Sequence, residues 1–334
     1  MRKEHSEFGG CLHFEKPYLK NGGFYNKYSD YRIDVDSGRS ALQYIIERYR
    51  YKRIWLPVYN CPLVGQRISA ISDIKICWYN LKDDFYPDII NNQFLQGDCL
   101  VWVNYCGVMQ NELVDKIVSI QDNTPVKIIV DNIPAYFSEP RMNAINLYSC
   151  RKFIGVPDGG HIIGNVIKRT ELPTYSTAEN YIYLLKAIES GSNSAYDSYN
   201  ESEKRFKESK VAYGMPFLTK IILDSIDYNS VITKRKDNFK VLHDSLGSRN
   251  RLTFNTESNT PLVYPYLCSD KKLRKRLLDN KIYISRFWKH VLTNELANDF
   301  ERDLAEYLIP LPIDQRYEEN DMDYIARMVK KLED

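Results

Sequence analysis

The stretch Ser149-Cys-Arg-Lys152-Phe-Ile-Gly-Val-Pro-Asp158-Gly-Gly160 places one lysine in an apolar, glycine-rich turn. The apolar side chains that follow it, Phe153, Ile154 and Val156, favour partial removal of water from the lysine amine. Because loss of water disfavours the charged ammonium form, a neutral amine becomes available to attack a carbonyl. The Asp-Gly-Gly end of the stretch allows the chain to turn sharply into the apolar run 161–164.

This turn has two interpretations. In the first, Lys152 forms a Schiff base with pyridoxal phosphate (PLP), and the hydroxyl of Ser149, three residues earlier, binds an anion. In the second, Lys152 is an ordinary surface lysine whose aliphatic stem packs on the protein. A lone lysine does not separate the two, so the PLP hypothesis depends on the rest of the chain.

The composition is that of a globular protein. The 334 residues are 43% hydrophobic and 27% charged, and the length favours about two domains. The net charge of +2 is too small to indicate a nucleic-acid partner, and the basic cluster 271–276 lies in an amphipathic pattern typical of a solvent-exposed helix face. No run approaches the roughly 18 apolar residues of a membrane span, and the N-terminus lacks an apolar export segment. We therefore expect a cytoplasmic protein without a membrane segment.

The seven cysteines form no CxxC pair and no ligand cluster with the five histidines. We expect no metal site, and we expect reduced, mostly buried thiols.

The chain divides into three parts by pattern. Residues 1–30 lack periodicity and are predicted to be an irregular N-terminal arm, residues 31–233 alternate strands with helices, and residues 234–334 change to an α+β pattern. The predicted fold class is α/β, with a large domain built on a mostly parallel sheet flanked by helices and a smaller C-terminal α+β domain. The predicted strands are 32–36, 53–57, 74–78, 99–104, 126–131, 144–148, 161–167, 260–265 and 281–284. One helix is predicted to start at residue 41, and the other predicted helices are 111–121, 176–190, 200–212, 216–226, 234–246, 270–279 and 320–332.

Polar or aromatic residues follow several of these strands. Tyr59 follows strand 53–57, Asn104 ends strand 99–104, and Asp131 ends the continuous apolar strand 126–131. In parallel α/β sheets, ligands bind outside the carboxyl ends of the strands. Tyr59 is equally suited to stack on a flat ring or to pack in the core, and Asp131 is equally suited to a functional role or to a helix cap.

The turn 37–40 leads from a predicted strand into a helix, so its free backbone N–H groups and the helix dipole would face a phosphate. The alternative is a plain helix cap by Ser37 or Ser40.

In their order along the chain, these landmarks resemble the DegT/DnrJ/StrS family of PLP-dependent sugar aminotransferases, within the aspartate-aminotransferase superfamily of PLP fold type I. The likeness runs from about Ser37 to the C-terminus. It rests on the landmarks Ser37-Gly-Arg-Ser-Ala-Leu42, Leu56-Pro-x-Tyr59, Val103-Asn-Tyr-Cys-Gly107, Val130-Asp131, Ser149-x-x-Lys152 with Asp158-Gly-Gly160, and Leu311-Pro-Ile313.

The resemblance implies a role for each matching residue. Lys152 would be the lysine that binds PLP covalently and moves protons between the amino donor and the cofactor, and Asp131 would keep the pyridine nitrogen protonated. Tyr59 would stack on the ring and Asn104 would lie near its 3′ oxygen. The phosphate would be bound by Gly38, Arg39, Ser40 and Ser149.

Two features depart from the family pattern. Pro134 occupies the position, three residues after the aspartate, where the family usually has Gln or His, and Tyr136 substitutes for it only at a different spacing. The Ser-x-x-Lys spacing is also shorter than in many sugar aminotransferases and is closer to the wider superfamily. The first departure leaves the remaining contacts of the ring open.

The function that the resemblance implies is transfer of an amino group, from glutamate, to a nucleotide-linked keto-sugar in surface polysaccharide or related sugar biosynthesis. The alternatives are another PLP enzyme with a non-sugar substrate, and a non-catalytic aminotransferase-like binding or regulatory protein. The family also implies a homodimer with shared active sites, and the flexible, tyrosine-containing stretch 191–200 is suited to reach a neighbouring subunit. Residues 286–290 either face a nucleotide diphosphate or place a buried tryptophan beside surface charges.

Overall fold

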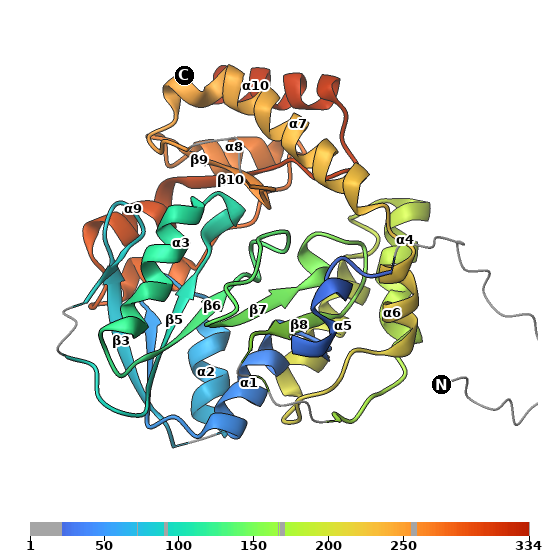
Figure 1. The fold of residues 1–334 in the computed structure, drawn as a ribbon. Helices are drawn as coiled ribbons and strands as arrows, with labels where there is room; N and C mark the ends of the chain where they lie inside the picture. Colours follow the sequence, from blue (N-terminus) through green and yellow to red (C-terminus); the bar gives the residue numbers. More distant parts are fainter. Residues whose placement is uncertain are drawn as a thin grey trace, which may run out of the picture.

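A computed structural model describes residues 22–71, 73–89, 93–165, 167, 171–254 and 259–333. Within these residues, eight strands form one sheet in the order β1-β8-β7-β6-β5-β2-β3-β4 (Figure 1). The central run β3-β2-β5-β6-β7 is parallel, and β8, β1 and β4 pair antiparallel to their neighbours. The strands are β1 (Arg32–Val35), β2 (Arg53–Pro57), β3 (Lys75–Leu81), β4 (Pro87–Asp88), β5 (Asp98–Val103), β6 (Lys127–Asp131), β7 (Ile145–Ser149) and β8 (Gly160–Ile163).

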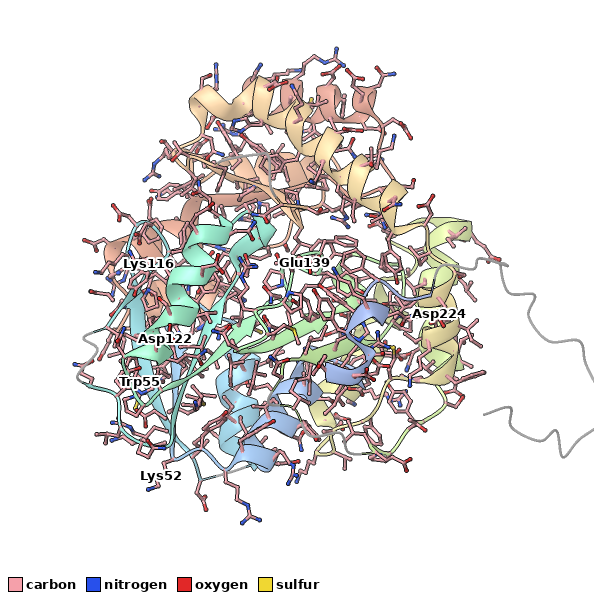
Figure 2. The ribbon with its side chains drawn as sticks, viewed as in Figure 1. Lys52, Trp55, Lys116, Asp122, Glu139 and Asp224 are labelled. Atoms are coloured by element: carbon pink, nitrogen blue, oxygen red, sulfur yellow. The ribbon has the colours of Figure 1, made fainter. Side chains whose placement is uncertain are left out.

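The central strands are buried on both faces because their alternate side chains enter two different cores. In β5, Cys99 and Val101 pack with α1 (Gly38–Tyr49), while Leu100 and Trp102 pack on the opposite side with α3 (Asn111–Val118). Side chains fill the space between the sheet and its helices, and Trp55 of β2 is among them (Figure 2). The continuous apolar runs in the sequence therefore form the interior of a parallel sheet, as predicted.

The remaining helices of the first two-thirds of the chain are α2 (Pro62–Ile71), α4 (Ile182–Ser190), α5 (Tyr196–Glu208) and α6 (Phe217–Asp224). Helix α2 contacts α1, and α4 contacts α5. Figure 1 shows α4, α5 and α6 at the β8 side of the sheet.

The C-terminal residues add a second layer. The antiparallel strands β9 (Val263–Leu267) and β10 (Leu308–Pro312) form a two-stranded sheet, which Figure 1 shows at the top beside the helices. The helices here are α7 (Tyr228–Leu246), α8 (Leu273–Asp279), α9 (Asp299–Tyr307) and α10 (Glu319–Glu333). In α10 the buried residues recur at helical spacing, at Met322, Ile325, Ala326 and Val329, and this face packs against α7. Residue 233, where the sequence pattern changes, lies inside α7.

Two predicted elements are wrong. Residues 281–284 form no strand: Ile282 and Ile284 are buried alternately, as in a strand, but β9 pairs with β10 instead. The stretch 191–200 is not a loop throughout, because α5 already begins at Tyr196. The predicted arm 1–30 lies outside the described residues up to residue 21, and residues 26–31 form a 3₁₀ helix.

In the described part of the chain, no helix combines the length and the hydropathy of a membrane span. The same residues contain no group of three or more His, Cys, Asp or Glu side chains placed to hold a metal ion. The six cysteines that the structure describes are free thiols, and four of them are buried.

Candidate active site

The predicted site residues converge at one edge of the sheet. Because β2, β5, β6 and β7 are parallel, their carboxyl ends meet at this edge, and β1 also ends there because it is separated from β7 by one antiparallel strand. Tyr59 follows β2, Asn104 follows β5, Asp131 ends β6 and Ser149 ends β7. Lys152 lies three residues beyond the end of β7, in the 3₁₀ turn η5 (Cys150–Lys152).

The lysine turn is fixed by its backbone. The N–H of Cys150 donates to the carbonyl of Gly159 (3.0 Å), and the N–H groups of Phe153 and Ile154 donate to the carbonyl of Cys150. A Cβ at Gly160 would lie 2.5 Å from the carbonyl oxygen of Tyr148, so only glycine fits where β8 begins. These contacts hold the base of the Lys152 side chain in one place.

Lys152 lines a cavity of mostly apolar walls. Its side chain is exposed to this cavity rather than packed in the core. The walls nevertheless remove water from the amine, and this desolvation lowers the pKa of Lys152 below its ordinary value, against the opposing charge of Asp131. The other lining residues are Tyr59, Phe85, Tyr105, Cys106, Val108, Met109, Pro134, Leu252, Phe254, Leu262, Pro265, Phe287, Trp288 and Leu308. The amine is therefore shifted toward the neutral, nucleophilic form that the sequence predicts.

Asp131 is a buried carboxylate whose negative charge raises the pKa of Lys152. Burial raises the pKa of Asp131 to about 6, although the N–H of Ile133, which donates to Oδ1 (2.9 Å), and the charge of Lys152 both lower it. No basic side chain in the described residues forms a direct ion pair with this carboxylate. A buried acid that is only partly compensated is suited to bind a protonated ligand nitrogen.

Asn104 pairs with a residue that sequence analysis missed. Its Nδ2 donates to Oδ1 of Asn132 (2.9 Å) and to the hydroxyl of Ser138 (3.2 Å). Asn104 Oδ1 and Asn132 Nδ2 are both buried without a hydrogen-bond partner within the described protein. Asn132 directly follows Asp131, so its place after the strand was the available signal. Asn104 and Asn132 therefore leave one unpaired acceptor and one unpaired donor at the end of the strand that carries the Asp131 carboxylate.

Tyr59 lies in an aromatic wall. Its ring makes an edge contact with Trp288 (centroids 4.6 Å apart) and lies 5.8 Å from Tyr105, whose hydroxyl donates to the carbonyl of Tyr59 (2.8 Å). The Tyr59 hydroxyl is buried without a partner. Tyr59 lines the same cavity as Lys152. Its stacking role stays a prediction.

The turn 37–40 is a capped helix start with an unforeseen carboxylate. Ser37 caps α1 by accepting a hydrogen bond from the N–H of Ser40 (3.2 Å), and its hydroxyl donates to Asp36 (2.9 Å). Asp36 is buried, and burial raises its pKa. A Cβ at Gly38 would overlap Ile133, so glycine at this position lets α1 approach the Asp131 turn. A phosphate at this turn would meet the backbone N–H groups of α1 together with the Asp36 carboxyl group.

The guanidinium of Arg39 pairs with Glu203 of α5 (3.4 Å), and Arg151, beside Lys152, pairs with the same carboxylate. Helix α5 therefore joins the start of α1 to the lysine turn. Arg286 is likewise occupied, by Glu306 (2.6 Å) and the carbonyl of Ala305. Sequence analysis gave no signal for Glu203, because its partners are more than 50 residues away.

The two departures from the family pattern lie in different places. Pro134 lines the Lys152 cavity. Tyr136 does not line it: its side chain is fully buried in an aromatic cluster with Tyr25, Tyr148 and Phe153. Tyr136 therefore does not take the place of the missing Gln or His side chain.

Arg235 of α7 ties the C-terminal residues to the lysine turn. Its guanidinium donates to the carbonyls of Phe153, Pro261 and Leu262 and lies over the Phe153 ring, 4.8 Å from its centroid. Gln315 donates to the same Phe153 carbonyl (2.8 Å). Burial lowers the pKa of Arg235 to about 10. The sequence signal was a charged residue inside the buried stripe of α7, which is Val231, Arg235, Asn238, Phe239, Leu242 and Leu246.

We expect Arg235→Ala to destabilise the protein by about 2–5 kcal/mol, because buried carbonyls lose their donor at roughly 1–3 kcal/mol each. Arg235→Lys should recover only part of this, since an ammonium group cannot donate in a fork and stack at once. Urea denaturation measures the effect. Lys240→Ala, an exposed change on the same helix, is the control, and an equal effect of the two alanine variants would contradict the role of Arg235.

The donor set fits PLP. A desolvated lysine, a buried acid and two unsatisfied buried amide atoms lie at one sheet edge, and the first turn of α1 lies close by. These are the groups needed for an aldehyde, a ring nitrogen, a ring oxygen and a phosphate.

No protein-family model and no curated protein matches the sequence. Solved structures do match the fold. A DegT DnrJ EryC1 StrS aminotransferase from Brucella abortus is 13% identical, with a TM-score of 0.60 over 92% of this chain and 87% of that one. The aminotransferase TlmJ from Streptoalloteichus hindustanus is 12% identical, with a TM-score of 0.63 over 95% and 91%. Spr1654 from Streptococcus pneumoniae, in its PLP form, is 14% identical, with a TM-score of 0.63 over 92% and 88%. The chain therefore has the fold of the DegT/DnrJ/EryC1/StrS aminotransferases, which confirms the α/β fold class that its sequence predicts.

Proposed function

We propose that this protein is a PLP-dependent aminotransferase that transfers an amino group from glutamate to a nucleotide-linked keto-sugar, in surface polysaccharide or related sugar biosynthesis in the cytoplasm. One observation carries the proposal: a lysine with a lowered pKa lies beside a buried, unpaired aspartate at the carboxyl edge of an aminotransferase fold. Spr1654, which shares the fold, is provisionally called a sugar aminotransferase, and this name supports the choice of acceptor.

The residues divide the chemistry between them. PLP, when bound, supplies an electrophilic aldehyde and a ring that accepts electrons. Lys152 Nζ would hold the aldehyde carbon and, when free and neutral, take a proton from the donor and return it to the product. The Asp131 carboxylate would hold the proton on the ring nitrogen, Asn104 and Asn132 would bind the ring oxygen, and Ser149 with the start of α1 would bind the phosphate. The aromatic walls exclude water from the amine.

An absorbance band at about 410–430 nm, abolished by borohydride, tests the proposal. After reduction, the peptide containing Lys152 should carry the mass of the cofactor. Glutamate should bleach the band, and a keto-sugar nucleotide should restore it. A purified protein that takes up no PLP would refute the assignment.

We also propose a homodimer with shared active sites, with residues 31–233 forming the PLP-binding domain and residues 234–334 the small domain. Helix α4 has no buried residue, and its exposed side chains Ile182, Leu185 and Ile188 form one apolar stripe. Ile188 is 83% exposed, which is unfavourable for a lone helix face in water. Because α5 contacts α4 and its Glu203 binds Arg151, an interface on this stripe would lie close to the lysine turn.

We expect a mass of two chains by light scattering at micromolar concentration, and a mass of one chain for Ile188→Lys, because a charge in the apolar stripe opposes association. Leu95→Lys, at another exposed leucine, should remain a dimer. A single-chain mass for the fully active, PLP-loaded wild type would contradict shared sites.

A further inference from the structure

A second cavity lies next to the Lys152 cavity, between α2, β3 and the 3₁₀ helix η8 (Lys289–Thr293). Its volume is about 590 Å³, within the range of small-molecule sites. The Lys152 cavity lies at the groups that we propose to react, so the part of a nucleotide-linked acceptor that does not react needs a site beside it.

The two cavities share their borders. Tyr59 and Trp288, in edge contact, line the Lys152 cavity, while the following residues Asn60, Cys61 and His290 line the second. The second cavity is therefore adjacent to the Lys152 cavity along two chain segments.

An exposed indole forms one wall. Trp78 in β3 is 42% exposed, although it lies in a strand of the main sheet. A Cβ at Gly65 of α2 would lie 3.2 Å from the Trp78 ring. The indole therefore lies close to the Gly65 backbone, and part of the indole remains exposed to solvent. An indole in this position offers a flat surface to a planar ring.

The polar groups of the walls are all uncharged. Asn60 is 5% exposed, its Oδ1 accepts from the N–H of Cys61 (2.7 Å), and its Nδ2 has no hydrogen-bond partner within the described protein. Burial lowers the pKa of His290, so its imidazole is neutral at pH 7 and offers one donor and one acceptor. Gln66, Ser69 and Asn294 add amide and hydroxyl groups.

This lining selects for one kind of ligand. Of the described residues around the cavity, none is Lys, Arg, Asp or Glu, so a phosphate or carboxylate would find no counter-charge in the walls. A neutral, planar ring with carbonyl and N–H groups at its edge would stack on Trp78 and satisfy Asn60 Nδ2. Nucleobases have this chemistry.

We propose that this cavity binds the nucleoside end of the nucleotide-linked acceptor, a site that deepens, and rests on, the proposed function. The base stacks on Trp78 and accepts a hydrogen bond from Asn60. The phosphates lie outside the cavity, where Lys289 is exposed beside His290.

Calorimetric titration of the PLP-treated full chain with UDP and dTDP, and with pyrophosphate as a probe without a base, tests this site. At least one nucleotide should bind more tightly than pyrophosphate. Trp78→Leu should weaken it by roughly 5–150-fold, the range of a lost base–aromatic stack, and Trp78→Phe should retain most of the affinity. Tyr324→Leu, at an exposed aromatic on α10, is the control and should bind as the wild type does.

Equal nucleotide affinity of wild type and Trp78→Leu, or binding of pyrophosphate as tight as that of the nucleotides, would overturn the site. So would a protein that shows the 410–430 nm band and binds neither nucleotide. Trp78-dependent binding in a protein without that band would support the nucleoside site and refute the aminotransferase, so the two failures are distinguishable.

Discussion

Lys152→Ala is expected to remove the borohydride-stable mass from the lysine peptide and to abolish transamination, because no other described residue of the apolar cavity carries an amine. Lys152→Arg should have the same effect: a guanidinium keeps the charge but stays protonated and does not condense with an aldehyde. Absorbance near 410–430 nm and peptide mass spectrometry after borohydride measure the result.

Both variants should fold, since the Lys152 side chain is open to the cavity and the turn is held by backbone hydrogen bonds. A circular dichroism spectrum equal to that of the wild type is the control. Lys186→Ala, at an exposed lysine of α4 whose amine donates to Ser198, should leave the adduct unchanged. A normal cofactor adduct in either Lys152 variant would refute the assignment.

Asp131→Asn is the second change with a large expected effect. An amide cannot hold the ring nitrogen protonated, so the half-reaction with glutamate should slow by at least about a hundredfold, the cost of roughly 3 kcal/mol in the transition state. The cofactor should still bind, because Lys152 and the phosphate groups remain. Stopped-flow absorbance with glutamate measures the rate, and unchanged kinetics would make Asp131 a structural cap.

The same variant has a separate effect on the cofactor-free protein. Burial raises the pKa of Asp131 from 3.8 to about 6, so the folded chain binds this proton more tightly than the unfolded chain. The resulting stabilisation is complete below about pH 4 and is lost as the pH rises through 6. Asp131→Asn should therefore stabilise the apo protein by about 1–3 kcal/mol at pH 8, and by much less at pH 4, in urea denaturation. Lower stability of the variant at pH 8 would contradict a desolvated, unpaired carboxylate.

The sequence located the sheet and its functional edge because the signals are local. Runs such as 99–103 are apolar throughout, which is characteristic of a strand buried on both faces. Residues that follow parallel strands must meet at one edge, and Tyr59, Asn104, Asp131 and Ser149 do so. The identity and order of these residues were sufficient to predict the fold.

Sequence analysis failed where the pairing partner lies far along the chain. Residues 281–284 have the alternation of a strand, but β9 pairs with residues 308–312, whose two prolines gave no strand signal. Tyr196 begins a helix although serine and asparagine precede it, because Glu203 and Phe206 of α5 contact two arginines that are distant in sequence, Arg39 of α1 and Arg151 of η5. Hydrogen-bonding partners are a property of the folded chain and leave no local pattern.

The sequence by itself determined the α/β fold, the lysine turn and the carboxylate at the end of β6, since each follows from the order of residues within a short segment. Only the tertiary structure decided the state of those groups. The lowered pKa of Lys152 comes from cavity walls contributed by residues as far away as Trp288 and Leu308, and the raised pKa of Asp131 comes from its burial. The hydrogen bond from Arg235 to the Phe153 carbonyl joins segments that are far apart in sequence, and such segments also form the uncharged cavity beside Trp78. Desolvation and hydrogen bonding depend on which surfaces meet, and this is fixed only when the chain folds.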